Sequence, residues 1–173
     1  MVTNQRDVAR VGRARQITVP ADARALSTLP RVDYEDAFLV ETALARERTG
    51  EQWARAMLED APARTRRALR WTWLALGLRL GSTRDEQRVF GWELRRSSPD
   101  FALLAARSLI GLQAEVLLER GQDSVLCASF LRLGNPLARA TWAGIAPGHR
   151  RAVPDLLTQA ARRVGQMERM DES

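Results

Sequence analysis

Short stretches of alternating apolar and polar residues mark the β-strands that the sequence predicts. Between residues 33 and 42, Tyr34, Phe38 and Val40 share one face, whereas acidic residues occupy the other. A period of two is typical of a strand with one buried face. Asp36 is the exception, because its carboxyl group falls among the apolar positions. We therefore expect a half-buried strand over residues 33–42 with one polar side chain in the core.

Two helices are predicted to follow this strand. Thr49 and Gln52 have the spacing of a capping box, in which each side chain binds a free backbone N–H of the first helical turn. Pro62 ends this helix and suits the first turn of a second one. The second helix is expected from about Ala63 to Leu80, where Gly81 stops it.

Further strand-like segments come next and are separated by turn residues. They cover residues 88–96, 101–119 and 125–133. A single strand over residues 101–119 would span about 63 Å at 3.3 Å per residue, which is much longer than a usual strand. We expect the chain to fold back around Ser108 to Gly111. Strands joined by turns as short as these are antiparallel.

The last long segment has the period of a helix. From about Leu137 to Val164 an apolar stripe recurs every three to four residues and includes Trp142 and His149. Pro147 and Pro154 lie within it, and each is expected to kink or restart the helix. Gly165 is expected to end it.

Both ends of the chain are polar. Residues 1–30 predict a loose N-terminal arm with a short extended piece near residues 16–19, and residues 166–173 predict a polar tail. The domain itself is thus expected to span residues 31–165.

The order of these elements predicts an α+β fold. It consists of a curved antiparallel sheet of about five to seven strands wrapped around a long C-terminal helix, with a helix pair after the first strand. Residues 31–165 resemble the START-like or SRPBCC superfamily of helix-grip proteins, in particular an uncharacterised bacterial branch related to polyketide cyclases. The resemblance is carried by residues 33–38, the helix pair 50–80, and the segments 135–139 and 146–150. It implies a cavity between the sheet and the last helix that holds a hydrophobic small molecule.

Composition narrows the possible chemistry. The chain has one Cys (Cys127), one His (His149) and no Lys, so an internal disulfide, a Cys/His zinc site, a Walker lysine and a Schiff-base lysine are all excluded. We expect no metal and no cofactor. The longest apolar stretch, residues 71–78, is too short to span a membrane, and a cytoplasmic location is expected.

The chain is basic, with a net charge of +6. All positive charges are arginines, and they cluster at residues 6–15 and 64–70. We interpret these clusters mainly as solvated surface, so nucleic-acid binding is not expected.

Six residues are candidates for lining the predicted cavity. Four are aromatic: Phe38, Trp71, Trp92 and Trp142 could form its wall or simply fill the core.

The other two candidates are polar. Arg107 lies in an apolar segment, where its charge requires a partner such as Asp36 or Glu93, or an anionic ligand. His149 could be a hydrogen-bonded core residue, a polar contact for a ligand, or a general base. Cys127 is expected to be buried, although a nucleophile pair with His149 is conceivable.

Three function classes remain open. The first is a binder or carrier of a small hydrophobic or lipid-like metabolite. The second is a cyclase or dehydrase that uses the same cavity, with His149 as acid or base and Arg107 holding an anionic group. The third is a regulatory interaction module with a basic arm. A homodimer is possible in each class, and a fully packed core without a cavity is the structural alternative.

Overall fold

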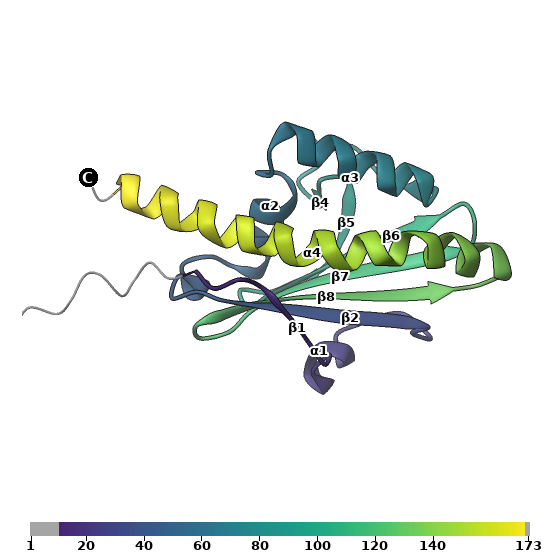
Figure 1. Cartoon of the computed structure of the whole chain (residues 1–173), viewed down its shortest axis with the longest axis horizontal. Helices are drawn as coiled ribbons and strands as arrows, with labels where there is room; N and C mark the ends of the chain where they lie inside the picture. The colour runs from purple at the N-terminus through teal and green to yellow at the C-terminus, as the bar shows by residue number, and fades with distance from the viewer. Residues whose placement is uncertain (1–10, 172–173) are drawn as a thin grey trace, which may run out of the picture.

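The chain folds into one curved antiparallel sheet with a long helix across one face (Figure 1). The computed structural model describes residues 11–171. Its sheet has the strand order β1-β2-β8-β7-β6-β5-β4, and β3 pairs with β6. The strands are β1 (Arg15–Ile17), β2 (Tyr34–Glu41), β3 (Leu78–Arg79), β4 (Arg88–Val89), β5 (Trp92–Ser97), β6 (Phe101–Ser108), β7 (Leu112–Arg120) and β8 (Ser124–Leu133). The helices are α1 (Ala21–Ala25), the 3-10 turn η1 (Ala45–Glu47), α2 (Gly50–Leu58), α3 (Ala63–Ala75) and α4 (Pro136–Asp171).

This architecture confirms the predicted α+β class, the curved antiparallel sheet and the helices after the first predicted strand. The chain does turn back after Ser108, and Gly111 takes a positive φ of 84° in the turn between β6 and β7. The sheet has eight strands rather than five to seven. The additional ones are two or three residues long, which is too short to show an alternating pattern.

The central strands are buried on both faces. On the inner face, Phe38, Leu104 and Cys127 pack under α2 and α4. On the outer face, Leu103 and Phe130 pack under the segment that follows β1, including Ala23 of α1. Burial on both sides explains the nearly continuous apolar runs of β6 and β8. Residues 15–32 are therefore part of the folded domain and not a loose arm.

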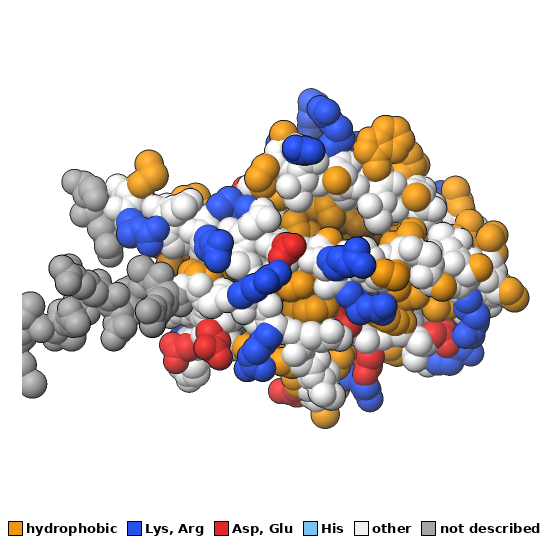
Figure 2. Space-filling view, viewed as in Figure 1, with side chains coloured by type: hydrophobic (Ala, Val, Ile, Leu, Met, Phe, Trp, Pro, Cys, Tyr) orange, Lys and Arg blue, Asp and Glu red, His pale blue; other side chains and the backbone are white. Residues whose placement is uncertain are grey.

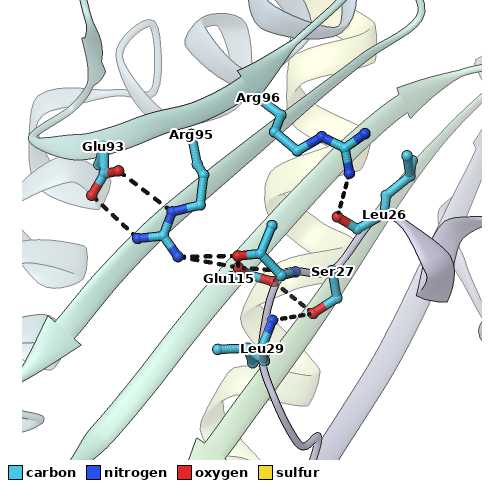
Figure 3. Close-up of polar contacts among 8 residues, drawn as sticks. Leu26, Ser27, Leu29, Glu93, Arg95, Arg96 and Glu115 are labelled. Carbon is cyan, nitrogen blue, oxygen red and sulfur yellow. Dashed lines mark hydrogen bonds and ion pairs between the residues drawn. The ribbon is translucent and has the colours of Figure 1, made fainter.

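A buried carboxylate fixes this N-terminal segment to the outer face (Figure 3). Glu115 of β7 is fully buried and accepts hydrogen bonds from the Ser27 hydroxyl (2.6 Å), the Thr28 backbone N–H (3.0 Å) and the Thr28 hydroxyl. Arg95 lies 3.4 Å from the same carboxylate and also pairs with Glu93. A β-bulge between Leu94 and Arg96 shifts the register of β5 at this point, as bulges commonly do where a side chain is redirected.

Helix α4 differs from its predicted form. It is one continuous helix from Pro136 to Asp171, and neither Pro147 nor Pro154 interrupts it (Figure 1). Gly165 does not end it either. A Cβ atom added at Gly165 would lie 3.6 Å from the Leu44 side chain, which is an ordinary contact distance, so the helix continues through this position without strain. An ion pair of 3.6 Å between Arg48 and Glu168 holds the final turns.

Helix α3 ends earlier than predicted. It stops at Ala75, because Gly77 adopts a positive φ of 63°, which favours glycine and turns the backbone out of the helix. Leu78 and Arg79 then form β3 beside β6. The predicted capping box of α2 is confirmed, with both reciprocal hydrogen bonds present between Thr49 and Gln52.

Candidate functional site

A cavity of about 400 Å³ lies between the inner face of the sheet and the helices α3 and α4. Figure 2 shows apolar side chains in the hollow between these two helices. The sheet contributes Trp92, Leu112, Ala114, Val116, Cys127, Ser129 and Leu131, and the helices contribute Leu69, Trp73, Leu76, Trp142, Ile145, His149 and Val153, among others. The wall is thus mostly apolar and carries few polar groups, which is typical of a small-molecule site.

Small residues on α4 keep the hollow open. Gly144, Gly148 and Ala152 recur every four residues along the side of α4 that lines the cavity. A Cβ atom added at Gly144 or Gly148 would meet no other atom within 4 Å. The space between α3 and α4 is therefore unfilled at these positions.

Two aromatic clusters form the walls. Trp73 packs edge-to-face against Trp92 and Phe90, with ring centroids 5.5 Å apart in each pair. The second cluster joins Trp142 to Tyr34 at 4.9 Å and to His149 at 5.1 Å. Edge-to-face pairs of this kind contribute about 0.5–1.5 kcal/mol each beyond the burial of their surface.

The indole N–H groups of Trp92 and Trp142 lack hydrogen-bond acceptors. Both residues line the cavity, both nitrogens are buried, and neither has a partner among the described residues. Trp53, which does not line the cavity, shows the usual arrangement, because its N–H donates to the Ala45 carbonyl at 3.0 Å. Leaving a buried donor unpaired costs about 1–3 kcal/mol. Trp92 and Trp142 therefore line the cavity with other atoms, and an acceptor on a bound molecule could pair with either N–H group only after a neighbouring side chain moves aside.

A polar cluster of four residues lies beside the cavity and consists of Tyr34, Asp36, Ser129 and His149. The His149 Nε2 atom lies 3.2 Å from the Asp36 carboxylate and 3.2 Å from the Ser129 hydroxyl. The Tyr34 hydroxyl donates to Asp36 at 2.7 Å. Asp36 and Ser129 are directly opposite each other on β2 and β8, so the strand register brings them together.

Two pKa values in this cluster are shifted. Burial alone would raise the pKa of Asp36, but hydrogen bonds and charge from His149, with further hydrogen bonds from Tyr34 and Ser129, lower it below its usual value. Burial raises the pKa of Tyr34 to about 12, and the hydrogen bond and negative charge of Asp36 add to the effect. Asp36 is therefore the ionised member of the pair and Tyr34 the protonated one at neutral pH.

This geometry is not that of a nucleophilic serine. In a Ser-His-Asp triad the serine and the aspartate bind opposite nitrogens of the imidazole ring. Here Ser129 and Asp36 both approach Nε2. A Cys127–His149 nucleophile pair is not observed either, because the contacts of the His149 ring nitrogen are to Ser129 and Asp36. Burial also raises the pKa of the Cys127 thiol, which disfavours the reactive thiolate.

Three of the six predicted residues line the cavity, namely Trp92, Trp142 and His149. Phe38 is buried in the inner core without reaching the cavity.

Trp71 is 65% exposed on the outside of α3, so its placement in the cavity wall was wrong. It lies two helical positions, or about 200°, from Trp73, which takes that place.

Arg107 is exposed as well, and its predicted interior location was wrong. It follows Leu103 and Ala105 on the outer face of β6, at the end of the strand. Asp36 pairs with His149 and Glu93 with Arg95, so neither of the partners expected for Arg107 is available to it.

The structure describes only part of the predicted basic arm, from residue 11 onward. Arg6 and Arg10 lie outside the described residues. Arg13 and Arg15 form exposed ion pairs with Asp155 (3.5 Å) and Glu41 (3.8 Å), and such pairs contribute little to stability.

Within residues 11–171, no three His, Cys, Asp or Glu side chains are grouped so that they could hold a metal ion. In the same range, no helix combines the length and the apolar character required to span a membrane.

No protein-family model, no curated protein and no solved structure matches this chain. The geometry of the cavity is therefore the basis for assigning a function.

Proposed function

We propose that this protein binds a small hydrophobic molecule that carries a hydrogen-bond acceptor. The observation that supports the proposal is a mostly apolar cavity lined by Trp92 and Trp142, whose buried indole N–H groups have no partner among the described residues. The volume of about 400 Å³ is within the range of small-molecule sites. A carbonyl, hydroxyl or carboxylate oxygen on the ligand would remove the cost of an unpaired donor. The resemblance to START-like proteins points in the same direction and remains a prediction.

The first test measures whether the cavity is used. Native mass spectrometry of the purified protein should show a retained apolar adduct, and 8-anilinonaphthalene-1-sulfonate should bind with blue-shifted emission. Gly148→Leu places a large side chain in the opening and should abolish probe binding. Ala143→Leu is the matched control, because it adds the same side chain at an exposed position of α4 that does not line the cavity. An adduct-free mass together with equal probe binding by the two variants would contradict the proposal.

The second test measures the role of the indole donors. Trp92→Phe and Trp142→Phe keep an aromatic ring but remove the N–H group, so each should weaken a ligand with an acceptor by about fivefold, or about 1 kcal/mol. Trp53→Phe is the control, because Trp53 already donates to Ala45 and lies outside the cavity. Equal affinities for all three variants would show that the N–H groups do not contact the ligand.

A second function, general acid–base catalysis, is favoured by the His149–Asp36 contact. Because ionised Asp36 accepts the hydrogen of Nε2, the other ring nitrogen of His149 would carry the lone pair of a general base. The N–H groups of Trp92 and Trp142 could then stabilise a developing oxyanion. Arg107 cannot serve this reaction, because it is exposed on the outer face.

The catalytic proposal has its own test, since binding alone does not require a base. His149→Ala should abolish turnover of a cyclisable or dehydratable substrate while the circular dichroism spectrum is unchanged. If turnover persists in His149→Ala, the acid–base role is excluded and the binding function is unaffected.

A further inference from the structure

Helix α3 has two different faces. One face carries Leu69, Trp73 and Leu76 and lines the ligand cavity. The opposite face is exposed, although it includes large apolar side chains: Trp71 is 65% and Leu74 is 64% exposed. Among the five tryptophans, Trp71 is the only one that is not buried. A tryptophan and a leucine exposed one turn apart on a helix indicate a surface that has an apolar partner.

The same face is strongly basic. Arg64, Arg67 and Arg70 are exposed and fall, with Trp71 and Leu74, within an arc of about 120° at 3.6 residues per turn. No acidic residue occurs between Ala63 and Arg84. In the described part of the chain, none of these three arginines forms an ion pair, whereas many of the other arginines do. Figure 2 shows basic and apolar side chains side by side over α3.

A surface groove of about 940 Å³ continues this face toward the sheet. Its lining combines Arg66, Arg67 and Arg70 with the apolar side chains of Leu78, Leu80 and Phe90. Glu59 also lines it, but its carboxylate is already paired with Arg55 and accepts the backbone N–H of Phe90. Arginine guanidinium groups bind phosphate well, and apolar side chains in the same groove suit the first carbons of an acyl chain. The groove therefore combines the two features of a phospholipid: an anionic head and an apolar tail.

We propose that the outer face of α3, with the adjoining groove, docks on a membrane surface rich in anionic phospholipid. Trp71 and Leu74 enter the boundary between headgroups and acyl chains, and the arginines bind the phosphates around them. Docking would place the cavity, which lies directly beneath α3, next to the membrane. The inference goes beyond the proposed ligand binding and can be tested without a ligand.

The main experiment is sedimentation of the full chain with vesicles. Vesicles of equal parts phosphatidylglycerol and phosphatidylcholine should bind the protein, pure phosphatidylcholine should not, and 0.5 M NaCl should weaken the binding. Arg67→Gln/Arg70→Gln should reduce the partition coefficient by about 25-fold, at about fivefold per arginine. Arg151→Gln/Arg162→Gln is the matched control: it removes the same charge from exposed positions of α4 and should reduce binding much less.

The apolar contribution is tested separately. Trp71→Ser/Leu74→Ser should reduce partitioning by about tenfold or more. Leu109→Ser, which removes a side chain that is 76% exposed in the turn between β6 and β7, should have no effect. Brominated lipids should quench the tryptophan fluorescence of the wild type, and Trp71→Phe should bind but lose this quenching.

Three results would overturn the proposal. They are the absence of binding to anionic vesicles, binding that both α3 double variants leave unchanged, and binding to an acidic peptide or to DNA through Arg67 and Arg70 with no affinity for vesicles. Gly148→Leu should still bind vesicles, because it closes only the cavity. Failure of the membrane proposal and failure of the ligand proposal are therefore distinguishable.

Discussion

The two faces of the sheet each bury one carboxylate, and the two carboxylates have different surroundings. Glu115 on the outer face is surrounded by fixed donors from Ser27, Thr28 and Arg95. Asp36 on the inner face is bound by Tyr34, Ser129 and His149, and two of these, Ser129 and His149, line an open cavity. The first arrangement attaches one segment of the chain to another. The second holds polar groups at a place that a small molecule can reach.

Replacement of Glu115 should have the largest effect on stability. Glu115→Gln leaves the buried donors incompletely paired and removes the charge that faces Arg95, so we expect the free energy of unfolding to fall by about 3–5 kcal/mol. Urea unfolding followed by circular dichroism measures this loss.

Glu119→Gln, four residues along β7, is the control for the Glu115 variant. Burial and the charges of Asp22 and Asp100 raise the pKa of Glu119, so removing its charge should change stability by no more than about 0.5 kcal/mol. Equal losses in the two variants would contradict the structural role of Glu115.

Replacement of Asp36 should have a smaller effect on stability and a clear effect on the cavity. Asp36→Asn keeps the shape but weakens three hydrogen bonds to a charged group, which should cost about 1.5–3 kcal/mol in chemical denaturation. Because the pKa of Asp36 is lowered in the folded state, its contribution is present above the usual carboxyl pKa and is lost as the pH falls through the lowered value. The variant should therefore show a weaker dependence of stability on pH in acid. An unchanged dependence would mean that Asp36 is not the responsible group.

The single tyrosine reports directly on this site. In the folded protein, Tyr34 should ionise near pH 12, compared with about 10 for an exposed tyrosine. Since the folded state holds the proton more tightly, the stabilisation is complete below pH 10 and is lost as the pH rises from about 10 to about 12. Absorbance at 295 nm follows the ionisation, and circular dichroism shows whether the chain is still folded. Asp36→Asn should move the midpoint down, whereas Glu115→Gln should not move it.

Removal of one hydroxyl from each face should have the smallest effects. Ser27→Ala takes one donor from Glu115 and should reduce the free energy of unfolding by about 1 kcal/mol. Ser129→Ala should cost about the same or less, but only Ser129→Ala should change the affinity for a cavity ligand. A change of ligand affinity in Ser27→Ala would erase the distinction between the two faces.

Sequence patterns predicted the fold more fully than the site. Period-two and helical patterns identified β2 and the helices α2, α3 and α4, because these elements are long enough to show their period. The fold-back between β6 and β7 was predicted from the length of the apolar run, whereas α1 and η1 were missed. The patterns could not show that Trp73 rather than Trp71 faces the cavity, because apolar residues nearly encircle the end of that helix.

The alternation of apolar and polar residues in β2 did identify Asp36 as a polar residue on the buried face. Its contact with Ser129 and His149 depends on strand register and on the position of α4, which local sequence does not contain. The docking of residues 15–32 was missed for the same reason, since its anchor, Glu115, is a distant residue on β7.

The sheet is open, and its two margins are short. β1 pairs with three residues of β2 and β4 with two residues of β5, so neither margin of the sheet is one long, continuous strand. Two copies of the chain would gain very little from joining their sheets edge to edge, which protects the protein against extended β-aggregates. Self-association of this protein would therefore have to use side chains on its helices. Among the described residues, α3 and the two ends of α4 are the helical surfaces where large apolar groups face the solvent.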